Sequence, residues 1–159
     1  MGFGEAIGSV FRKYAVFAGR ARRSEYWYFA LFGVLVSIPA AILDKIFAPQ
    51  QDNGPFSAVL SLVLLLPQLS VTVRRLHDTD RSGWWLGGFA LYATGALMLG
   101  MMLIFGPAGR GTTGPLPQIV VTALAFGALG YAVWLFVLSV LNGTEGPNRY
   151  GPDPKAPPV

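Results

Sequence analysis

The chain has 159 residues, the length of one ordinary domain, but its composition excludes an ordinary soluble one. Hydrophobic residues make up 53% of the sequence and charged residues 13%, whereas a soluble globular chain carries about 25% charged residues. The same values exclude a disordered chain, which needs low hydrophobicity and high charge. With no cysteine and one histidine, we expect no disulfide, no metal site and no cofactor. The composition therefore predicts a small integral membrane protein.

An amphipathic helix is predicted at residues 3–17, before the first long apolar segment. Apolar side chains recur there at steps of three and four residues. The polar residues on the other face are Glu5, Ser9, Arg12 and Lys13. We expect this helix to lie on the inner leaflet of the membrane, and the alternative is that it packs on another protein.

Four uncharged segments are long enough to cross a bilayer, which takes about 20 mostly apolar residues. They cover residues 26–43, 56–73, 84–106 and 119–141. Because backbone groups in hydrocarbon must be bonded within the segment, we predict four transmembrane α-helices. The alternative, a soluble bundle, would show a polar stripe on each helix. We predict one all-α membrane domain over residues 1–154 and an extended tail at 155–159.

The basic residues predict the orientation of the spans, since Lys and Arg concentrate on the cytoplasmic side. Ten of the twelve lie before the first span, between the second and third, or after the fourth, and only Lys45 and Arg110 fall on the other side. We therefore expect both termini in the cytoplasm and no nucleic-acid partner, because the positive charge marks topology. At the start of the first span, Ser24 is the predicted N-cap, and Glu25 suits the positive end of the helix dipole.

Three polar segments, which we call the polar rim, fall on the predicted cytoplasmic side: residues 17–27, 74–85 and 142–154. They contain the runs GRARRSEYWYF (19–29), RRLHDTDRSGWW (74–85) and GTEGPNRYGPDP (143–154). Together with Asp44 after the first span, these runs resemble the DUF805 family of small bacterial inner-membrane proteins, from about Phe17 to Pro154. The resemblance implies a multi-pass inner-membrane protein of unknown activity and brings no catalytic residue, cofactor or substrate. The stretch after RSGWW is longer than in many members, so the number of four spans rests on this sequence.

The polar rim supplies the candidate residues for binding a lipid or a protein partner. They are Arg20, Arg22, Arg23, Glu25, Arg74, Arg75, His77, Asp78, Arg81, Trp84, Trp85, Asn148 and Tyr150. Arginines at helix ends can form pockets for anionic head groups. The same charges can instead pair across the rim and only tie the loops together. A further reading is proton chemistry at His77 beside Asp78 or Asp80.

The leading hypothesis is a non-enzymatic membrane protein that binds anionic lipid or a protein partner through the polar rim. It requires the rim arginines to meet in an open pocket, free of internal ion pairs. A small transporter or channel is the alternative, and a membrane-embedded enzyme is a third. A channel requires one shared interior surface for the polar residues of the spans: Ser37, Ser61, Gln68, Thr72, Thr94, Thr122 and Ser139. Small residues in the last two spans suit close packing, within the monomer or in a homo-oligomer.

Overall fold

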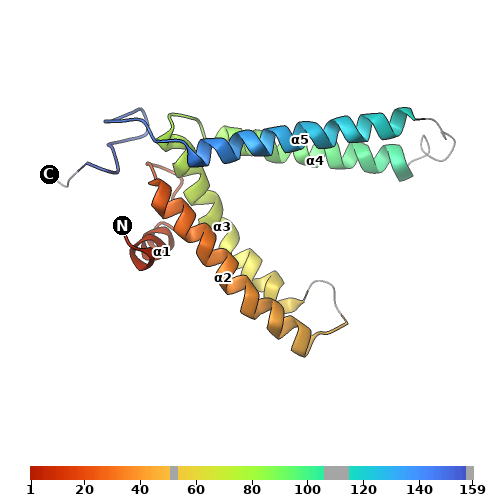
Figure 1. The fold of residues 1–159 in the computed structure, drawn as a ribbon, viewed down its shortest axis with the longest axis horizontal. Coiled ribbons are helices and arrows are strands. Elements are labelled where there is room, and N and C mark those ends of the chain that lie inside the picture. The colour runs from red at the N-terminus through yellow and green to blue at the C-terminus, as the bar shows by residue number, and fades with distance from the viewer. Residues whose placement is uncertain (51–53, 106–114, 157–159) are drawn as a thin grey trace. The chain divides into compact units, whose positions relative to one another are not determined.

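The computed structural model describes residues 1–50, 54–105 and 115–156, and it folds them into five α-helices (Figure 1). The helices are α1 (Phe3–Arg12), α2 (Arg23–Phe47), α3 (Pro55–Asp78), α4 (Trp84–Phe105) and α5 (Leu116–Val140). Apart from one antiparallel bridge between Asn148 and Gly151, the described part of the chain contains no β structure. The predicted all-α class is confirmed.

The chain forms two compact units. The first contains Met1–Ser82 and Leu141–Val159, and the second contains Gly83–Val140. In the first unit α2 and α3 lie side by side, and α1 packs on them (Figure 1); in the second unit α4 packs on α5. The single membrane domain expected from the sequence stays a prediction. So does the extended tail, of which residues 157–159 lie outside the described residues.

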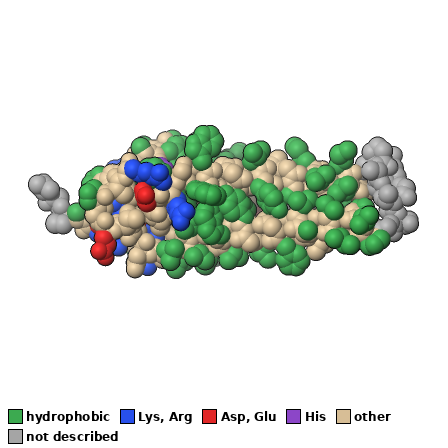
Figure 2. All heavy atoms as spheres, turned by 90° about the horizontal axis from the view of Figure 1, so that it is seen from above, with side chains coloured by type: hydrophobic (Ala, Val, Ile, Leu, Met, Phe, Trp, Pro, Cys, Tyr) green, Lys and Arg blue, Asp and Glu red, His purple; other side chains and the backbone are tan. Residues whose placement is uncertain are grey.

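The helices α2 to α5 are each long and apolar enough to cross a membrane, as predicted. Their large apolar side chains are mostly exposed, for example Leu62 on α3 at 69% and Leu91 on α4 at 78%. On the face shown in Figure 2, hydrophobic side chains cover the helices. Apolar surfaces of this extent need lipid around them.

The helices differ from the predicted spans at their ends. The helix α2 begins at Arg23 with Arg22 as its N-cap, so the prediction that Ser24 is the N-cap is wrong. The helix α3 continues past residue 73 to Asp78, so the residues from Arg74 onward lie on a helix and not in a loop. The predicted ends came from counting apolar residues, whereas a helix continues for as long as its polar side chains find partners.

The helix α1 is shorter than the predicted helix at residues 3–17, because Lys13 already leaves the helical conformation with φ −106° and ψ 36°. Ala6, Ser9 and Val10 are buried. The prediction that Ser9 lies on the polar face is wrong, since its hydroxyl donates a hydrogen bond to Glu25 Oε1 at 3.1 Å. One face of α1 therefore packs on the chain itself.

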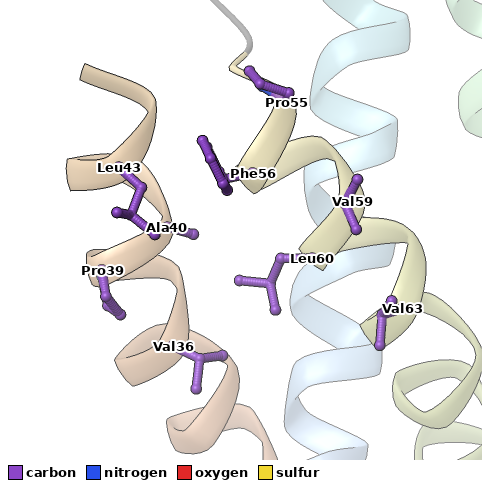
Figure 3. A pocket seen from close by; sticks show the side chains of 9 residues that line it. All are labelled: Val36, Pro39, Ala40, Leu43, Pro55, Phe56, Val59, Leu60 and Val63. Carbon is purple, nitrogen blue, oxygen red and sulfur yellow. The ribbon is translucent and has the colours of Figure 1, made fainter. Parts of the chain in front are cut away.

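A groove of about 590 Å³ lies between α2 and α3, near the C-terminal end of α2 and the N-terminal end of α3 (Figure 3). It is lined by Val36, Pro39, Ala40 and Leu43 of α2 and by Pro55, Phe56, Val59, Leu60 and Val63 of α3. All of these residues are apolar. The groove suits a hydrocarbon chain but supplies no polar side chain that would orient one.

Asp44 ties the same ends of α2 and α3 together. Its carboxylate accepts hydrogen bonds from the backbone N–H groups of Phe56 at 2.8 Å and Ser57 at 2.9 Å. These are two of the N–H groups that a helix leaves unsatisfied in its first turn, so Asp44 caps α3 from another helix. Gly54 lies so close that a Cβ atom there would overlap the Asp44 side chain.

Candidate functional site

Apart from residues 83–85, which belong to the second unit, the polar rim gathers around the C-terminal end of α3 in the first unit. The backbone N–H of Ala21 donates to the carbonyl of Arg74 at 3.0 Å, and the backbone N–H of Thr144 donates to the carbonyl of Asp78 at 2.8 Å. The last turns of α3 are therefore held both by the segment before α2 and by the tail after α5. Segments far apart in the sequence meet here, as the sequence predicts.

Asp78 lies at the centre of this region, with its side chain 2% exposed. Its Oδ1 accepts a hydrogen bond from Arg20 Nε at 2.9 Å, and its Oδ2 accepts one from Arg75 Nη1. The two terminal nitrogens of Arg20 donate to the carbonyls of Gly146 and Thr144. One carboxylate thus joins two buried guanidinium groups and, through Arg20, the tail.

The tail approaches Asp78 closely where it leaves α5. A Cβ atom at Gly143 would overlap the Asp78 carboxylate, so only glycine fits this position without a shift. Arg75 also donates to the carbonyl of Leu141. The tail is therefore bonded to α3 within a few residues of the end of α5.

Glu25 and Arg74 form a second buried ion pair, with Glu25 Oε1 and Arg74 Nη1 2.8 Å apart. Together with Arg20, Arg75 and Asp78 they form what we call the buried ion cluster. Nε and Nη2 of Arg74 are buried and have no hydrogen-bond partner among the residues that the structure describes. Removing one partner from such a pair is costly, because it leaves an uncompensated buried charge.

His77 connects α3 to the other two segments of the rim. Its ring stacks on Tyr150, with centroids 3.9 Å apart and the planes 2° from parallel. Its Nδ1 lies 3.1 Å from the carbonyl oxygen of Gly19, and its own carbonyl accepts a hydrogen bond from Asn148 Nδ2 at 2.9 Å. Gly19 has φ +86°, a conformation that glycine adopts without strain. These contacts favour a structural role for His77.

The carboxylates proposed to share a proton with His77 bond to arginines instead. Asp78 belongs to the buried ion cluster, and Asp80 Oδ1 pairs with Arg149 Nε at 3.1 Å. Arg149 also lies over the Tyr150 ring, 4.9 Å from its centroid. The geometry therefore does not favour proton chemistry at this histidine.

Asp153 folds the tail back on itself. It accepts hydrogen bonds from the backbone N–H groups of Lys155 at 2.8 Å and Gly146 at 3.2 Å. The bond from Lys155, supported by the bond from Gly146, holds the pKa of Asp153 below its ordinary value of 3.8, against the opposing effect of burial. Arg22 donates to the carbonyl of Pro154 and so attaches the tail to the segment before α2.

Four candidate residues lie outside the buried ion cluster, the contacts around His77 and the bond from Arg22 to the tail: Arg23, Arg81, Trp84 and Trp85. Arg23 and Arg81 are exposed. Trp84 and Trp85 belong to the second unit, where Trp85 meets Trp134 edge-on at a centroid distance of 4.8 Å. The structure therefore gathers nine of the thirteen candidates, and it does so largely through buried bonds.

Sequence reasoning missed five residues that hold this region together: Ser9, Gly19, Gly143, Arg149 and Asp153. Four of them lie inside the quoted motif runs, where turn-forming glycines and the Asp-Pro pair signal fixed backbone geometry. Ser9 gave no such signal, because a serine on an amphipathic helix usually faces water.

Most of the polar residues of the spans bond to their own helices. The hydroxyls of Ser37, Ser61 and Thr122 are on exposed residues, and each donates to a carbonyl three or four residues earlier. Thr72 and Ser139 do the same. This local bonding does not favour a polar path through the described part of either unit.

Comparisons with known proteins place the chain in a family. The family described as "Protein of unknown function (DUF805)" matches residues 14–152. Inner membrane protein YhaH of Escherichia coli (strain K12) is 32% identical over 154 residues, which cover 94% of this chain and 95% of that protein. Inner membrane protein YhaI of the same strain is 34% identical over 148 residues, 92% of each chain. No solved structure matches. With its four apolar helices the chain is a multi-pass inner-membrane protein, and it belongs to the DUF805 family.

Proposed function

We propose that this protein is a non-enzymatic membrane protein that binds anionic phospholipid at the cytoplasmic surface through exposed residues of α1 and the turn after it. The observation that carries the proposal is the pairing of charge and aromatic surface there. Arg12 and Lys13 are exposed, and the neighbouring Phe11 and Phe17 are exposed as well. Basic residues beside large apolar side chains are typical of helices that lie at the surface of an anionic membrane.

The proposal moves the lipid contact away from most of the arginines that the sequence pointed to. Arg20, Arg74 and Arg75 are each less than a tenth exposed, and each bonds to Glu25 or Asp78. Such groups give the rim its structure. The general attraction of anionic head groups to the surface therefore comes from exposed charges outside the cluster. The pairing of both carboxylates of the cluster with guanidinium groups also supports binding over catalysis.

The test uses the full chain purified in mild detergent and analysed by native mass spectrometry with phosphatidylglycerol and phosphatidylcholine. Wild-type protein is expected to retain phosphatidylglycerol preferentially. The double variant Arg12→Gln/Lys13→Gln should lose about 2 kcal/mol of this preference, at about 1 kcal/mol per basic residue. That loss corresponds to roughly thirtyfold in relative affinity.

Lys155→Gln is the matched control, because Lys155 is an exposed basic residue in the tail. Its lipid preference should equal that of the wild type. The proposal fails if wild-type protein shows no preference for the anionic lipid, or if the double variant keeps the full preference. Retention of a stoichiometric protein in place of lipid would support partner binding and would also contradict the lipid proposal.

A further inference from the structure

Arg74 has more hydrogen-bonding capacity than the chain uses. Its side chain is 1% exposed, and its Nη1 donates to Glu25 Oε1, an oxygen that also accepts from Ser9. Its Nε and Nη2 are equally buried, yet no described residue accepts a hydrogen bond from them. A buried donor without an acceptor costs the free energy of its lost hydration, and more so in a charged group. The Nε/Nη2 edge of the guanidinium group therefore needs a hydrogen-bond acceptor.

The geometry of the unused edge specifies the kind of acceptor. Nε and Nη2 lie on one side of the planar group and point their N–H bonds in parallel. Such a pair matches two oxygens of one carboxylate or phosphate group. A single carbonyl oxygen would satisfy only half of it.

The charge balance of the buried ion cluster points the same way. Its cations are Arg20, Arg74 and Arg75, and its anions are Glu25 and Asp78. Because guanidinium groups remain protonated, the cluster holds one more positive than negative charge. Asp78 already accepts from two arginines, so the missing negative charge belongs beside Arg74.

We infer that the Nε/Nη2 edge of Arg74 binds one phosphate oxyanion, either the head group of a phospholipid or free inorganic phosphate. The site is closed in the structure, and Ser9 and Val10 of α1 are buried against the same region. Because Nε and Nη2 of Arg74 are buried, the anion enters by a local displacement of the chain around them. This site is distinct from the proposed lipid contact at Arg12 and Lys13, because those residues are exposed and attract many lipids, whereas Arg74 holds one anion.

The experiment follows the Nε–H signal of Arg74 by NMR in the full chain, labelled with ¹⁵N-arginine and assigned by its loss in Arg74→Lys. One arm titrates inorganic phosphate into the protein in maltoside micelles, whose sugar head groups carry no phosphate, and the other titrates phosphatidylglycerol into the same micelles. A saturable shift at one anion per chain is expected in one arm. A shift in the first arm identifies free phosphate, and a shift only in the second identifies a lipid head group.

Two matched variants sharpen the test. Arg74→Lys keeps the charge beside Glu25 but loses the paired edge, so its anion affinity should fall about tenfold or more with the loss of one charge-assisted hydrogen bond. Arg12→Gln/Lys13→Gln should keep the saturable Arg74 shift even where it loses the general lipid preference. A fixed Arg74 signal in both arms of the wild-type experiment means that water fills the edge, and it overturns the inference. The inference is also overturned if the Arg74 shift disappears in Arg12→Gln/Lys13→Gln.

Discussion

Asp78 and Asp80 are two residues apart, yet the structure predicts opposite effects of removing their charge. The side chain of Asp78 is 2% exposed and bonds to two arginines, whereas that of Asp80 is 47% exposed and pairs with Arg149, which is 60% exposed. Asp78→Asn should lower the free energy of unfolding by about 3–5 kcal/mol, because it leaves buried guanidinium groups without a counter-charge. Asp80→Asn should cost less than about 1 kcal/mol.

Reversible unfolding in detergent micelles, followed by tryptophan fluorescence, measures both values. Equal effects at the two positions would show that the cluster is open to water, and the assignment of Asp78 as a buried centre would then be wrong.

Gly143 offers a steric test of the same contact. A methyl group there would overlap the Asp78 carboxylate, which two arginines hold in place and which cannot give way. Gly143→Ala should destabilise the protein by about 1–3 kcal/mol, as overpacked sites do. Limited proteolysis should then cut the tail faster than in the wild type. Gly33→Ala is the control, because nothing lies within 4 Å of its Cβ position; equal cleavage of both variants would contradict the close approach.

At the scale of single residues, the sequence predicted which polar groups would come together but not that they would be buried in ion pairs. The motif runs and the spans brought Arg20, Arg74 and Asp78 to one end of the helices. Their burial depends on how α1 and the tail cover that end, which periodicity and charge counts do not determine. An open basic pocket and a closed ion cluster have the same sequence signature.

At the scale of elements, the hydrogen bonds from the start of α3 to Asp44 of α2 lead to a prediction about stability. Asp44→Ala should lower the free energy of unfolding by about 0.5–2 kcal/mol, the usual cost of losing an N-terminal cap. Asp44→Asn should cost less, since the amide oxygen still accepts one of the bonds from Phe56 and Ser57. The same unfolding measurement ranks the three proteins. A neutral Asp44→Ala would mean that water satisfies the start of α3 as well as the carboxylate does.

The tail makes a prediction about pH. Because the pKa of Asp153 is lower in the folded protein than its ordinary 3.8, the carboxylate stabilises the folded tail above that pH. The contribution is lost as the pH falls through the lower, folded value. The amide protons of Gly146 and Lys155 should therefore keep constant NMR shifts from neutral pH to about 5 and change together below 3.8. In Asp153→Asn this change should be missing, and a change that persists there would assign the transition to another group.

The long helices could be predicted because hydropathy over about 20 residues is a strong signal, and all four are present. Their ends could not, because the polar continuation of α3 to Asp78 is stabilised by partners from other segments. The end of α1 at Arg12 had no clear signal either, since the apolar spacing continues through Phe17. Tertiary contacts decide where these helices stop.

At the scale of the whole molecule, orientation in the membrane is the prediction on which the lipid proposal depends. A reporter that is active only outside the cytoplasm should be active when fused after Gln50 or Pro115 and inactive when fused after Ser82 or Ala156. The pairing inside the buried ion cluster does not weaken this expectation, because Lys and Arg set topology while Asp and Glu contribute little. Arginine and lysine therefore count toward the cytoplasmic side even where they end in ion pairs.

An inverted reporter pattern would carry a specific consequence. The anionic surface that attracts Lys and Arg belongs to the cytoplasmic leaflet. Arg12 and Lys13 would then face the opposite leaflet, and the proposed lipid contact would lose its electrostatic basis. The Arg74 site would survive that result as a site for free phosphate, since its unused edge and its excess charge are properties of the folded chain. The reporter pattern and the Arg74 signal therefore test two separate proposals. The first shows on which side of the membrane Arg12 and Lys13 lie, and the second shows what the buried Arg74 binds.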